Sequence, residues 1–127
     1  MGVEPLYPET CRGRSSNAEA PAGVNWRFRV LEGEVIRFHD LCQGAQEFVA
    51  GHDFGDFVVW RRDDVPAYQL AVVVDDAEMR ISEVVRGLDL LRSTARQILL
   101  ARALGLASPD YYHCQLVTDA RGLRLAK

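Results

Sequence analysis

The sequence predicts an α/β domain, and two observations lead to that fold class. Residues Ala71 to Val74 form a continuous apolar run that ends at Asp75 and Asp76, which is typical of a parallel strand covered on both faces. Further along, a strand pattern over Ile81 to Val85 precedes a helical pattern, and a strand pattern returns over Tyr111 to Val117. A strand, a helix and a strand in that order form a parallel crossover unit. We therefore expect an α/β C-terminal half.

The helix between those two strands has a marked start and a marked stop. Thr94 and Gln97 have the spacing of a capping box, in which the two side chains satisfy free backbone N–H groups of the first turn. Gly105 suits the position after the last turn, where the backbone becomes left-handed. Between these signals lies an apolar stripe formed by Ile98, Leu100, Ala101 and Leu104.

The N-terminal half has a different pattern. Residues 1–23 are rich in proline, glycine and serine, so we expect loop there. From Val24 to Val30 apolar and polar residues alternate, as in a half-buried strand. A turn at Glu32–Glu34 and a returning strand from Val35 to Phe38 follow, and Phe57 to Trp60 is a further short strand candidate.

Composition limits the classes of function. The chain has 127 residues, 48% of them hydrophobic, which is enough for one domain with its own core. A net charge of −3 argues against a surface that coats nucleic acid, although a local RNA contact is compatible with it. The three cysteines are odd in number, and no apolar run approaches membrane-spanning length. We expect a cytoplasmic protein with reduced thiols and no membrane partner.

Polar residues near the predicted strand ends form a candidate ligand site. Tyr68 precedes the first predicted strand, and Arg86 and Asp89 follow the second. Open α/β sheets bind ligands at strand ends, and a tyrosine hydroxyl with an arginine fork suits a small amino acid. The alternative is that Arg86 forms a structural ion pair with Asp76 or Asp89. The three histidines are scattered, and we expect structural or solvent-facing roles for His39, His52 and His113.

Several blocks of the chain, in matching order and spacing, resemble the glutamyl-tRNA synthetase-like class I aminoacyl-tRNA synthetases. AYQLAVVVDD points to the glutamyl-Q tRNA(Asp) synthetase subgroup. The resemblance implies a ligase that activates glutamate with ATP and Mg²⁺ and transfers it to tRNA, either the queuosine of tRNA(Asp) or tRNA(Glu). The blocks that carry it are YPETCR, WRFRV, FHDLCQG, GDFVVWRR, AYQLAVVVDD, VVRG, LLRSTARQILL and GLRLAK.

The resemblance also implies a division of the chain. Residues 1–23 correspond to a loop-rich remnant of the zinc-binding region, and residues 24–62 to part of the inserted, β-rich connecting subdomain. Residues 63–127 correspond to the second half of the Rossmann-like catalytic domain, which ends in the KMSKS-type motif. The HIGH-type motif of the family's first half does not occur in the 127 residues. We therefore expect the chain alone to be inactive in glutamate activation.

Site residues follow from the resemblance, motif by motif. Tyr68 and Arg86 match the family's glutamate-contacting tyrosine and arginine. Within GLRLAK, Lys127 matches the catalytic lysine that neutralises ATP phosphates, and Arg124 stands at the motif's first lysine as a second ATP-binding residue. Ala126 replaces the motif's serine. Cationic groups are needed here because phosphoryl chemistry depends on charge stabilisation.

A partial zinc site is the other feature that the resemblance implies. Tyr7 and Cys11 match two ligands, but the upstream Cys-x-Cys pair that completes the site in the glutamyl-Q group does not occur in this sequence. Structural zinc normally has four protein ligands. We therefore expect zinc in a longer enzyme and not in this chain by itself.

Two other functions stay open. The chain is compatible with half of a split synthetase, whose separate partner polypeptide carries the HIGH motif. It is also compatible with a non-catalytic remnant that binds tRNA or a protein partner, which the altered RLAK motif and the incomplete zinc site favour.

Overall fold

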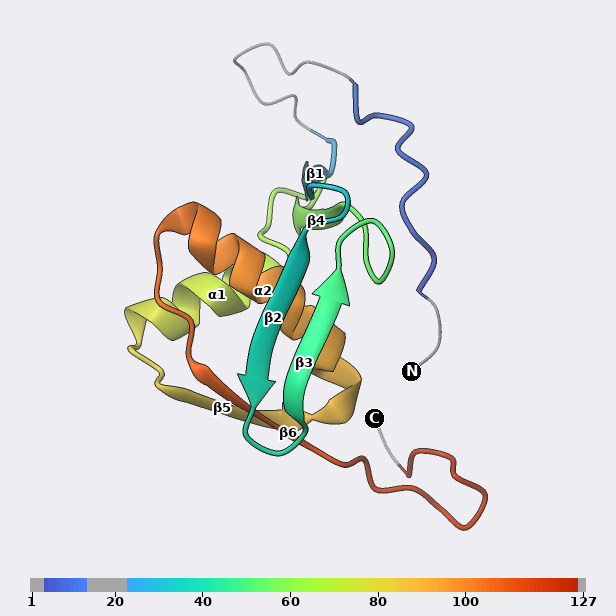
Figure 1. Cartoon of the computed structure of the whole chain (residues 1–127). Helices are drawn as coiled ribbons and strands as arrows, with labels where there is room; N and C mark the ends of the chain where they lie inside the picture. Colours follow the sequence, from blue (N-terminus) through green and yellow to red (C-terminus); the bar gives the residue numbers. More distant parts are fainter. Residues whose placement is uncertain (1–3, 14–22, 126–127) are drawn as a thin grey trace.

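The computed structural model of the chain describes residues 4–13 and 23–125 and consists of a mixed sheet packed against helices, with a small second sheet beside it (Figure 1). The α/β class is therefore confirmed. Its elements in chain order are β1 (Trp26–Phe28), β2 (Val35–Asp40), β3 (Gly44–Val49), β4 (Phe57–Trp60), α1 (Tyr68–Glu78), β5 (Glu83–Gly87), a 3₁₀ turn (Leu88–Leu90), α2 (Leu91–Leu104) and β6 (Asp110–Cys114).

The larger sheet has the order β3-β2-β6-β5. Strands β2 and β3 form an antiparallel hairpin, in which Val35 faces Val49. Strand β6 lies parallel to β5 on one side and to β2 on the other, where Asp40 pairs with Tyr111. Because α2 connects β5 to β6, the predicted parallel crossover is confirmed. Strands β1 and β4 form the separate two-stranded sheet.

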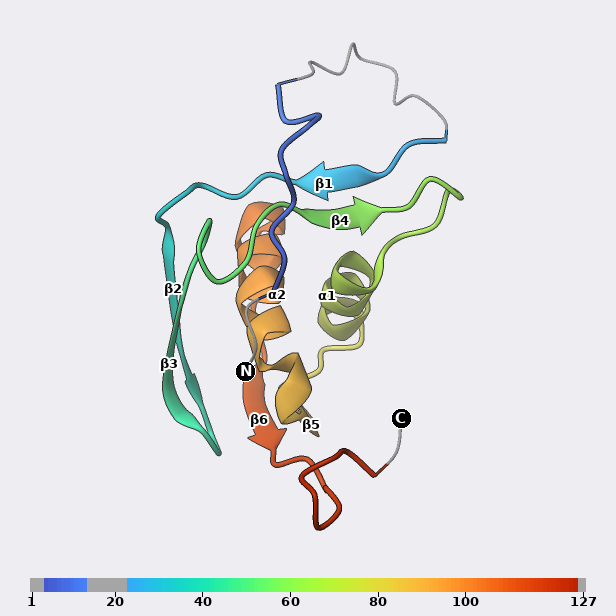
Figure 2. The same cartoon turned by 90° about the vertical axis from the view of Figure 1, so that its right-hand side faces the viewer.

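Helix α2 forms the centre of the molecule. Figure 2 shows it between the β2–β3 hairpin and α1, below the β1–β4 pair. Ten of its residues are buried, so the helix is enclosed on nearly every side. Its apolar residues join aromatic side chains of β3, β4 and β6 in one core, which includes Phe48, Phe57, Ile98, Leu99 and Tyr111.

The predicted strand at Ala71–Val74 is wrong, because these residues lie within α1. A run of valines has low helix propensity, but tertiary packing commonly outweighs propensity. Leu70 and Val73 lie three residues apart on one face of the helix and pack into the core. On the same side, Gln69 donates a hydrogen bond to Ser93 of α2 at 3.1 Å. Asp75 and Asp76 therefore lie in the last turns of a helix and not at a strand end.

The predicted capping box is also wrong. Helix α2 begins at Leu91, and its cap residue Leu90 makes no side-chain capping bond. Thr94 and Gln97 lie in the middle of the helix, are buried, and form hydrogen bonds to other elements. Thr94 Oγ1 accepts from Arg86, and Gln97 Nε2 donates to Gln69 Oε1 at 2.9 Å. The end of the helix is as predicted, since Gly105 has the left-handed φ of 69°.

Other predicted elements are confirmed with small shifts. The strand at Phe57–Trp60 has the predicted bounds, and those at Ile81–Val85 and Tyr111–Val117 become β5 and β6. A turn closes between Leu31 and Glu34. Strand β3 was not predicted. The larger sheet takes strands from both sides of the predicted boundary between residues 62 and 63, and the division into three segments stays a prediction.

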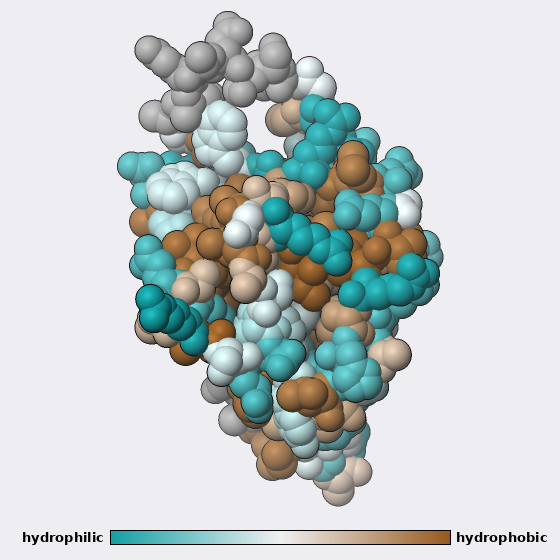
Figure 3. All heavy atoms as spheres, turned by 60° about the vertical axis from the view of Figure 1, so that its left-hand side comes forward, coloured by the Kyte–Doolittle hydropathy of each residue, from teal (hydrophilic) through white to brown (hydrophobic). Residues whose placement is uncertain are grey.

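Large apolar side chains also reach the surface, as the space-filling view shows on the face it presents (Figure 3). In the larger sheet, the paired residues Val85 and Tyr112 alternate away from the helices and are 61% and 37% exposed. Helices are present on the other face of the same strands, where Tyr111 and His113 are buried. Within the described ranges, no helix is long and apolar enough to cross a membrane.

Candidate functional site

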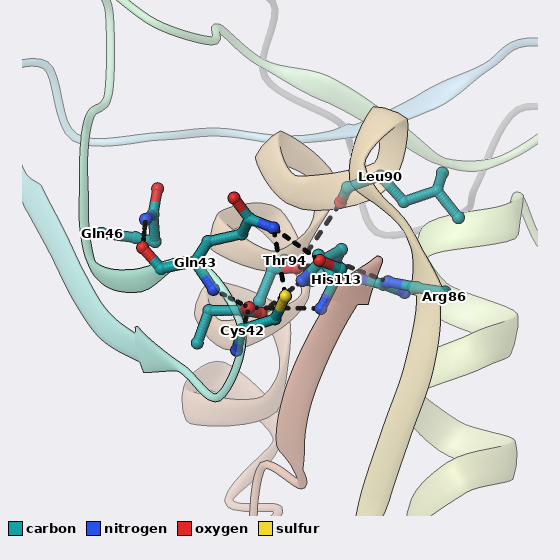
Figure 4. Close-up of polar contacts among 8 residues, drawn as sticks. Cys42, Gln43, Gln46, Arg86, Leu90, Thr94 and His113 are labelled. Atoms are coloured by element: carbon teal, nitrogen blue, oxygen red, sulfur yellow. Dashed lines mark hydrogen bonds and ion pairs between the residues drawn. The ribbon is translucent and has the colours of Figure 1, made fainter. Parts of the chain in front are cut away.

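Arg86 lies near the end of β5, and its side chain points toward His113 of β6 and Thr94 of α2 (Figure 4). Its Nε donates to His113 Nε2 at 3.0 Å, and its Nη2 donates to Thr94 Oγ1 at 2.8 Å. The guanidinium carbon lies 5.3 Å from the centre of the Tyr111 ring, a cation–π distance. Among the described residues, no ion pair joins Arg86 to Asp76 or Asp89, the alternative partners that the sequence suggested.

A buried acid–histidine pair lies behind Arg86. Asp40 ends β2 and His113 lies in β6, and both have an exposed fraction of 0%. His113 Nδ1 lies 2.5 Å from Asp40 Oδ2, while the backbone N–H groups of Cys42 and Gln43 donate to Asp40 Oδ1 at 3.0 and 2.9 Å. Burial acts to raise the pKa of Asp40, but the hydrogen bonds outweigh burial and lower this pKa to about 2. Asp40 is therefore a carboxylate at neutral pH.

Sequence reasoning did not find this pair. Asp40 is next to His39, but the alternation of β2 turns His39 outward and Asp40 inward. Its partner His113 is 73 residues away in sequence and is brought close by the parallel pairing of β2 with β6. Of the three histidines, His113 is buried, and His39 and His52 are solvent-facing. A spacing pattern within one element contains no signal for such a contact.

Tyr68 is the first residue of α1, and its side chain is half exposed. Tyr68 and Arg86 both affect the pKa of a third residue, Tyr111. Burial raises the pKa of Tyr111 to about 12, the Arg86 charge opposes this, and Asp76 and Tyr68 add to it. These groups influence one another because they lie around one place. Arg86 and Tyr68, which are 18 positions apart in sequence, thus both act on the pKa of Tyr111.

The C-terminal segment reaches the same end of β5. Arg124 Nη1 donates to Asp89 Oδ2 at 2.7 Å, and both side chains are partly exposed. Asp89 follows Arg86 closely, and Gly87 permits its approach, because a Cβ at Gly87 would lie 2.5 Å from Asp89 Oδ1. Arg124 is therefore close to the predicted glutamate site. Lys127 lies outside the described residues.

Tyr7 and Cys11 also lie together, since the Cys11 backbone N–H donates to Tyr7 Oη at 3.0 Å. The Arg27 guanidinium stacks over the Tyr7 ring at 4.1 Å. In the described part of the chain, no group of three or more His, Cys, Asp or Glu side chains could hold a metal ion. Two ligands do not form a closed zinc site, so the residues present do not fit the metal by themselves.

A recess of about 360 Å³ lies beside this N-terminal segment. Its lining includes Tyr7, Arg12 and Asp56, and it shares no residue with the cluster around Arg86. Arg12 Nε lies 3.3 Å from Asp56 Oδ2, and Arg12 Nη2 donates a hydrogen bond to the Val30 carbonyl at 2.7 Å. These bonds attach the N-terminal segment to the body of the molecule, and we assign the recess no role in the Arg86 site.

Comparison with known proteins decides the family. The family model of the class I tRNA synthetase catalytic domain for E and Q matches residues 8–127. The chain belongs to this family. Within the class I synthetases of this kind, similar curated proteins are named glutamyl-Q tRNA(Asp) synthetase. That of Methylococcus capsulatus is 51% identical over 127 residues, which cover 99% of this chain and 41% of the relative.

Other members of the synthetase family agree with this match. The glutamyl-Q tRNA(Asp) synthetase of Burkholderia cenocepacia (strain HI2424) is 50% identical over 123 residues, covering 95% of this chain and 40% of the relative. That of Chromobacterium violaceum is 47% identical over 122 residues, covering 96% and 40%. The chain thus spans about 40% of the length of the curated relatives it matches.

Solved synthetase structures support the fold. The glutamate-tRNA synthetase of Elizabethkingia anophelis superimposes with a TM-score of 0.71 and 30% identity, over 79% of this chain and 20% of that chain. A glutamate tRNA ligase from Elizabethkingia meningosepticum, solved in complex with its amino acid, gives a TM-score of 0.68 and 28% identity, over 76% and 20%. The chain therefore has the α/β fold of part of a class I synthetase domain.

Proposed function

We propose that this chain is the glutamate-recognising part of an ATP-dependent enzyme that activates glutamate and transfers it to tRNA, with the queuosine of tRNA(Asp) as acceptor. The observation that carries the proposal is the 51% identity, over 99% of the chain, to a protein named glutamyl-Q tRNA(Asp) synthetase. Arg86 is partly buried and donates hydrogen bonds to His113 and Thr94, which is consistent with a ligand site near the end of β5.

In this proposal Arg86 and Tyr68 bind glutamate. Arginine suits a carboxylate because its planar fork donates two parallel hydrogen bonds. Tyr68 has a half-exposed side chain at the start of α1, and its hydroxyl suits a polar ligand. Both residue types match the tyrosine and arginine that the family resemblance assigns to glutamate.

ATP with Mg²⁺ is the proposed co-substrate, and Arg124 and Lys127 are the residues proposed to bind its phosphates, with Lys127 catalytic. Positive charge near a transferring phosphoryl group stabilises the charge that develops there. Arg124 approaches from the C-terminal segment through its ion pair with Asp89. Zinc is proposed for a longer enzyme, in which Tyr7 and Cys11 supply two of four ligands. We propose a cytoplasmic location for that enzyme.

Glutamate-dependent exchange between ATP and pyrophosphate tests the proposal. The 127 residues contain no HIGH-type motif, so we expect no exchange by the purified chain. We expect exchange when a HIGH-containing polypeptide from a glutamyl-Q relative is added or fused. Exchange by the chain alone would contradict the proposal that glutamate activation needs a HIGH-containing part as well as this chain. Co-purification with a small HIGH-containing protein would support a split enzyme.

A second candidate is a non-catalytic remnant that binds tRNA or a protein partner. The observation that favours it is Arg124, which stands at a lysine position of the family motif and is engaged by Asp89. Binding of tRNA(Asp) that is independent of ATP, together with no exchange activity in the presence of a HIGH-containing partner, would select this candidate over the catalytic one.

A further inference from the structure

Four elements meet at one buried cluster: Asp40 from β2, Arg86 from β5, Thr94 from α2 and His113 from β6. Figure 4 shows how Arg86, Thr94 and His113 lie together. Asp40, Thr94 and His113 each have an exposed fraction of 0%. Burying polar groups is costly unless each one is hydrogen-bonded. The pattern of donors and acceptors in this cluster is therefore a strong constraint on what each side chain can do.

Asp40 fixes which nitrogen of His113 carries the hydrogen. Its Oδ1 already accepts backbone N–H groups of Cys42, Gln43 and His113, at 3.0, 2.9 and 3.2 Å. Its Oδ2 faces His113 Nδ1 at 2.5 Å. A carboxylate is only an acceptor, so Nδ1 must be the donor. The position of the hydrogen on one ring nitrogen is set by the bond that the nitrogen makes.

The opposite nitrogen of His113 is consequently an acceptor. Nε2 lies 3.0 Å from Arg86 Nε and 3.2 Å from Thr94 Oγ1. Arginine nitrogens are always donors, since the guanidinium keeps its charge in proteins. A hydrogen on Nε2 would place two N–H groups against each other. The observed arrangement needs a neutral His113 with its hydrogen on Nδ1.

Both hydrogen bonds of Arg86 in the described residues use one edge of the guanidinium plane. Nε–H and one N–H of Nη2 lie along the same edge, and they bind His113 and Thr94. The edge formed by Nη1 and the second N–H of Nη2 is directed elsewhere. This second edge is the one that can donate two parallel bonds to a carboxylate.

We propose that Asp40 and His113 are positioning residues for glutamate recognition: the carboxylate fixes the imidazole, the imidazole accepts from Arg86 Nε, and the outer edge of the guanidinium is thereby held for a carboxylate of glutamate. The inference deepens the proposed function and rests on it, because it takes glutamate as the ligand of Arg86. Neither Asp40 nor His113 contacts the ligand.

The arrangement is tested first in the unmodified chain. Nitrogen-15 NMR of the imidazole distinguishes the two neutral forms and the protonated form. At neutral pH we expect the hydrogen of His113 on Nδ1, and a slowly exchanging Nε–H signal for Arg86 that shifts when L-glutamate is added. A hydrogen on Nε2, or on both nitrogens, overturns the inference without any substitution.

Asp40→Asn is the decisive variant. The asparagine carbonyl oxygen can still accept the turn N–H groups, but its amide now donates toward His113 Nδ1 and moves the imidazole hydrogen to Nε2. Nε2–H then opposes Arg86 Nε–H. We expect loss of the protected Arg86 signal and an affinity for L-glutamate lowered about tenfold. The secondary structure should stay as in the wild type.

Two variants at His113 distinguish its hydrogen bond to Arg86 from its contribution to packing. Glutamine can place a side-chain oxygen near the site of Nε2 and accept from Arg86, whereas leucine fills a similar volume and accepts nothing. We expect His113→Gln to keep more glutamate affinity than His113→Leu. Equal losses would point to packing alone and would overturn the positioning role.

The outcomes separate this inference from the function on which it rests. A wild-type chain that shows both NMR signals and no response to L-glutamate overturns the proposed function, and the inference with it. A wild-type chain that responds to L-glutamate, together with an Asp40→Asn chain that responds equally after its imidazole hydrogen has moved, overturns the inference alone.

Discussion

Arg86 is the residue on which the proposed recognition depends most, since it is always charged and its plane is held by hydrogen bonds to His113 and Thr94. Lysine at this position would keep the charge but lose the planar fork. We predict that Arg86→Lys lowers the affinity of the chain for L-glutamate by at least about tenfold. The measurement is a titration with L-glutamate followed by NMR or calorimetry.

The matched control is Arg61→Lys. Arg61 lies on an exposed turn, where it pairs with Asp63 at 2.6 Å and its side chain is 56% exposed. Surface pairs of this kind contribute little, so the glutamate affinity should not change. An equal loss of affinity in both variants would show that Arg86 has no special role.

The lowered pKa of Asp40 predicts how the stability of the folded chain changes at acid pH. This pKa falls from the ordinary 3.8 to about 2 in the folded chain, so the unfolded chain binds a proton more readily. The stabilisation is therefore fully present above the ordinary pKa and is lost as the pH falls through about 2. Its size is on the order of 2 kcal/mol.

Unfolding free energies of the wild type and of Asp40→Asn should therefore converge at acid pH. Denaturant titrations between neutral pH and pH about 2 measure the difference directly. A difference that stays constant over the whole range would mean that the Asp40 carboxylate is not specifically stabilised by its hydrogen bonds.

At the scale of elements, the end of α2 depends on backbone geometry. Gly105 has a φ of 69°, and a Cβ added there would meet nothing within 4 Å. Any cost of Gly105→Ala therefore comes from the left-handed backbone alone, and we predict about 1 kcal/mol of destabilisation. Gly13→Ala is the control, since Gly13 has equal space and no positive φ. Chemical denaturation compares the two, and equal stabilities would contradict the prediction.

The N-terminal segment is attached to α2 by a charged contact. Glu4 accepts from Arg96 Nη2 at 2.6 Å, and the Arg96 guanidinium lies near the rings of Phe54 and Phe57. Burial acts to raise the pKa of Glu4, but the bonds and charges of Arg96 and Arg92 outweigh it and lower this pKa. Removing the carboxylate would leave Arg96, whose side chain is 10% exposed, without this partner.

We predict that Glu4→Gln costs about 1–2 kcal/mol and increases proteolysis within residues 4–13. Glu47→Gln is the control: Glu47 bonds Arg37 at a similar distance of 2.7 Å, but both side chains are more than half exposed. It should cost about 0–0.5 kcal/mol. Equal costs for the two variants would mean that burial of Arg96 does not matter.

The elements also show how far local patterns can predict this fold. Strand β4 and the stop at Gly105 depend on short-range features, namely residue type, alternation and left-handed geometry, and they were predicted. Helix α1 was not, because four apolar residues in a row suit a strand or a buried helix equally. Packing of Leu70 and Val73 against the core decides between them.

Some residues of the candidate site could likewise be predicted from local sequence and others could not. Tyr68 and Arg86 were predicted to bind glutamate because they stand in recognisable motifs, and this role stays a prediction. Asp40, Thr94 and His113 were not assigned to it, because their contacts join strands and a helix that are distant in sequence. Such contacts exist only after the parallel strand β6 has been placed between β2 and β5.

At the scale of the whole molecule, the chain has the fold of part of a class I synthetase domain and matches about 40% of its relatives' length. In the described sheet β5 is an edge strand, and Val85 and Tyr112 face outward from it and from β6. Arg86, one of the two candidate glutamate residues, also lies on β5, but its side chain points to the opposite face of the sheet, toward α2. The arrangement is compatible with further protein beside β5, as the proposed function requires.

A chimera tests the central claim most directly. This chain would replace the matching segment of the Methylococcus capsulatus glutamyl-Q tRNA(Asp) synthetase, to which it is 51% identical, and transfer of labelled glutamate to tRNA(Asp) would be measured. We predict transfer by the chimera and its loss on Arg86→Lys. A folded chimera that binds tRNA(Asp) but transfers no glutamate, while the parent enzyme does, would contradict the account.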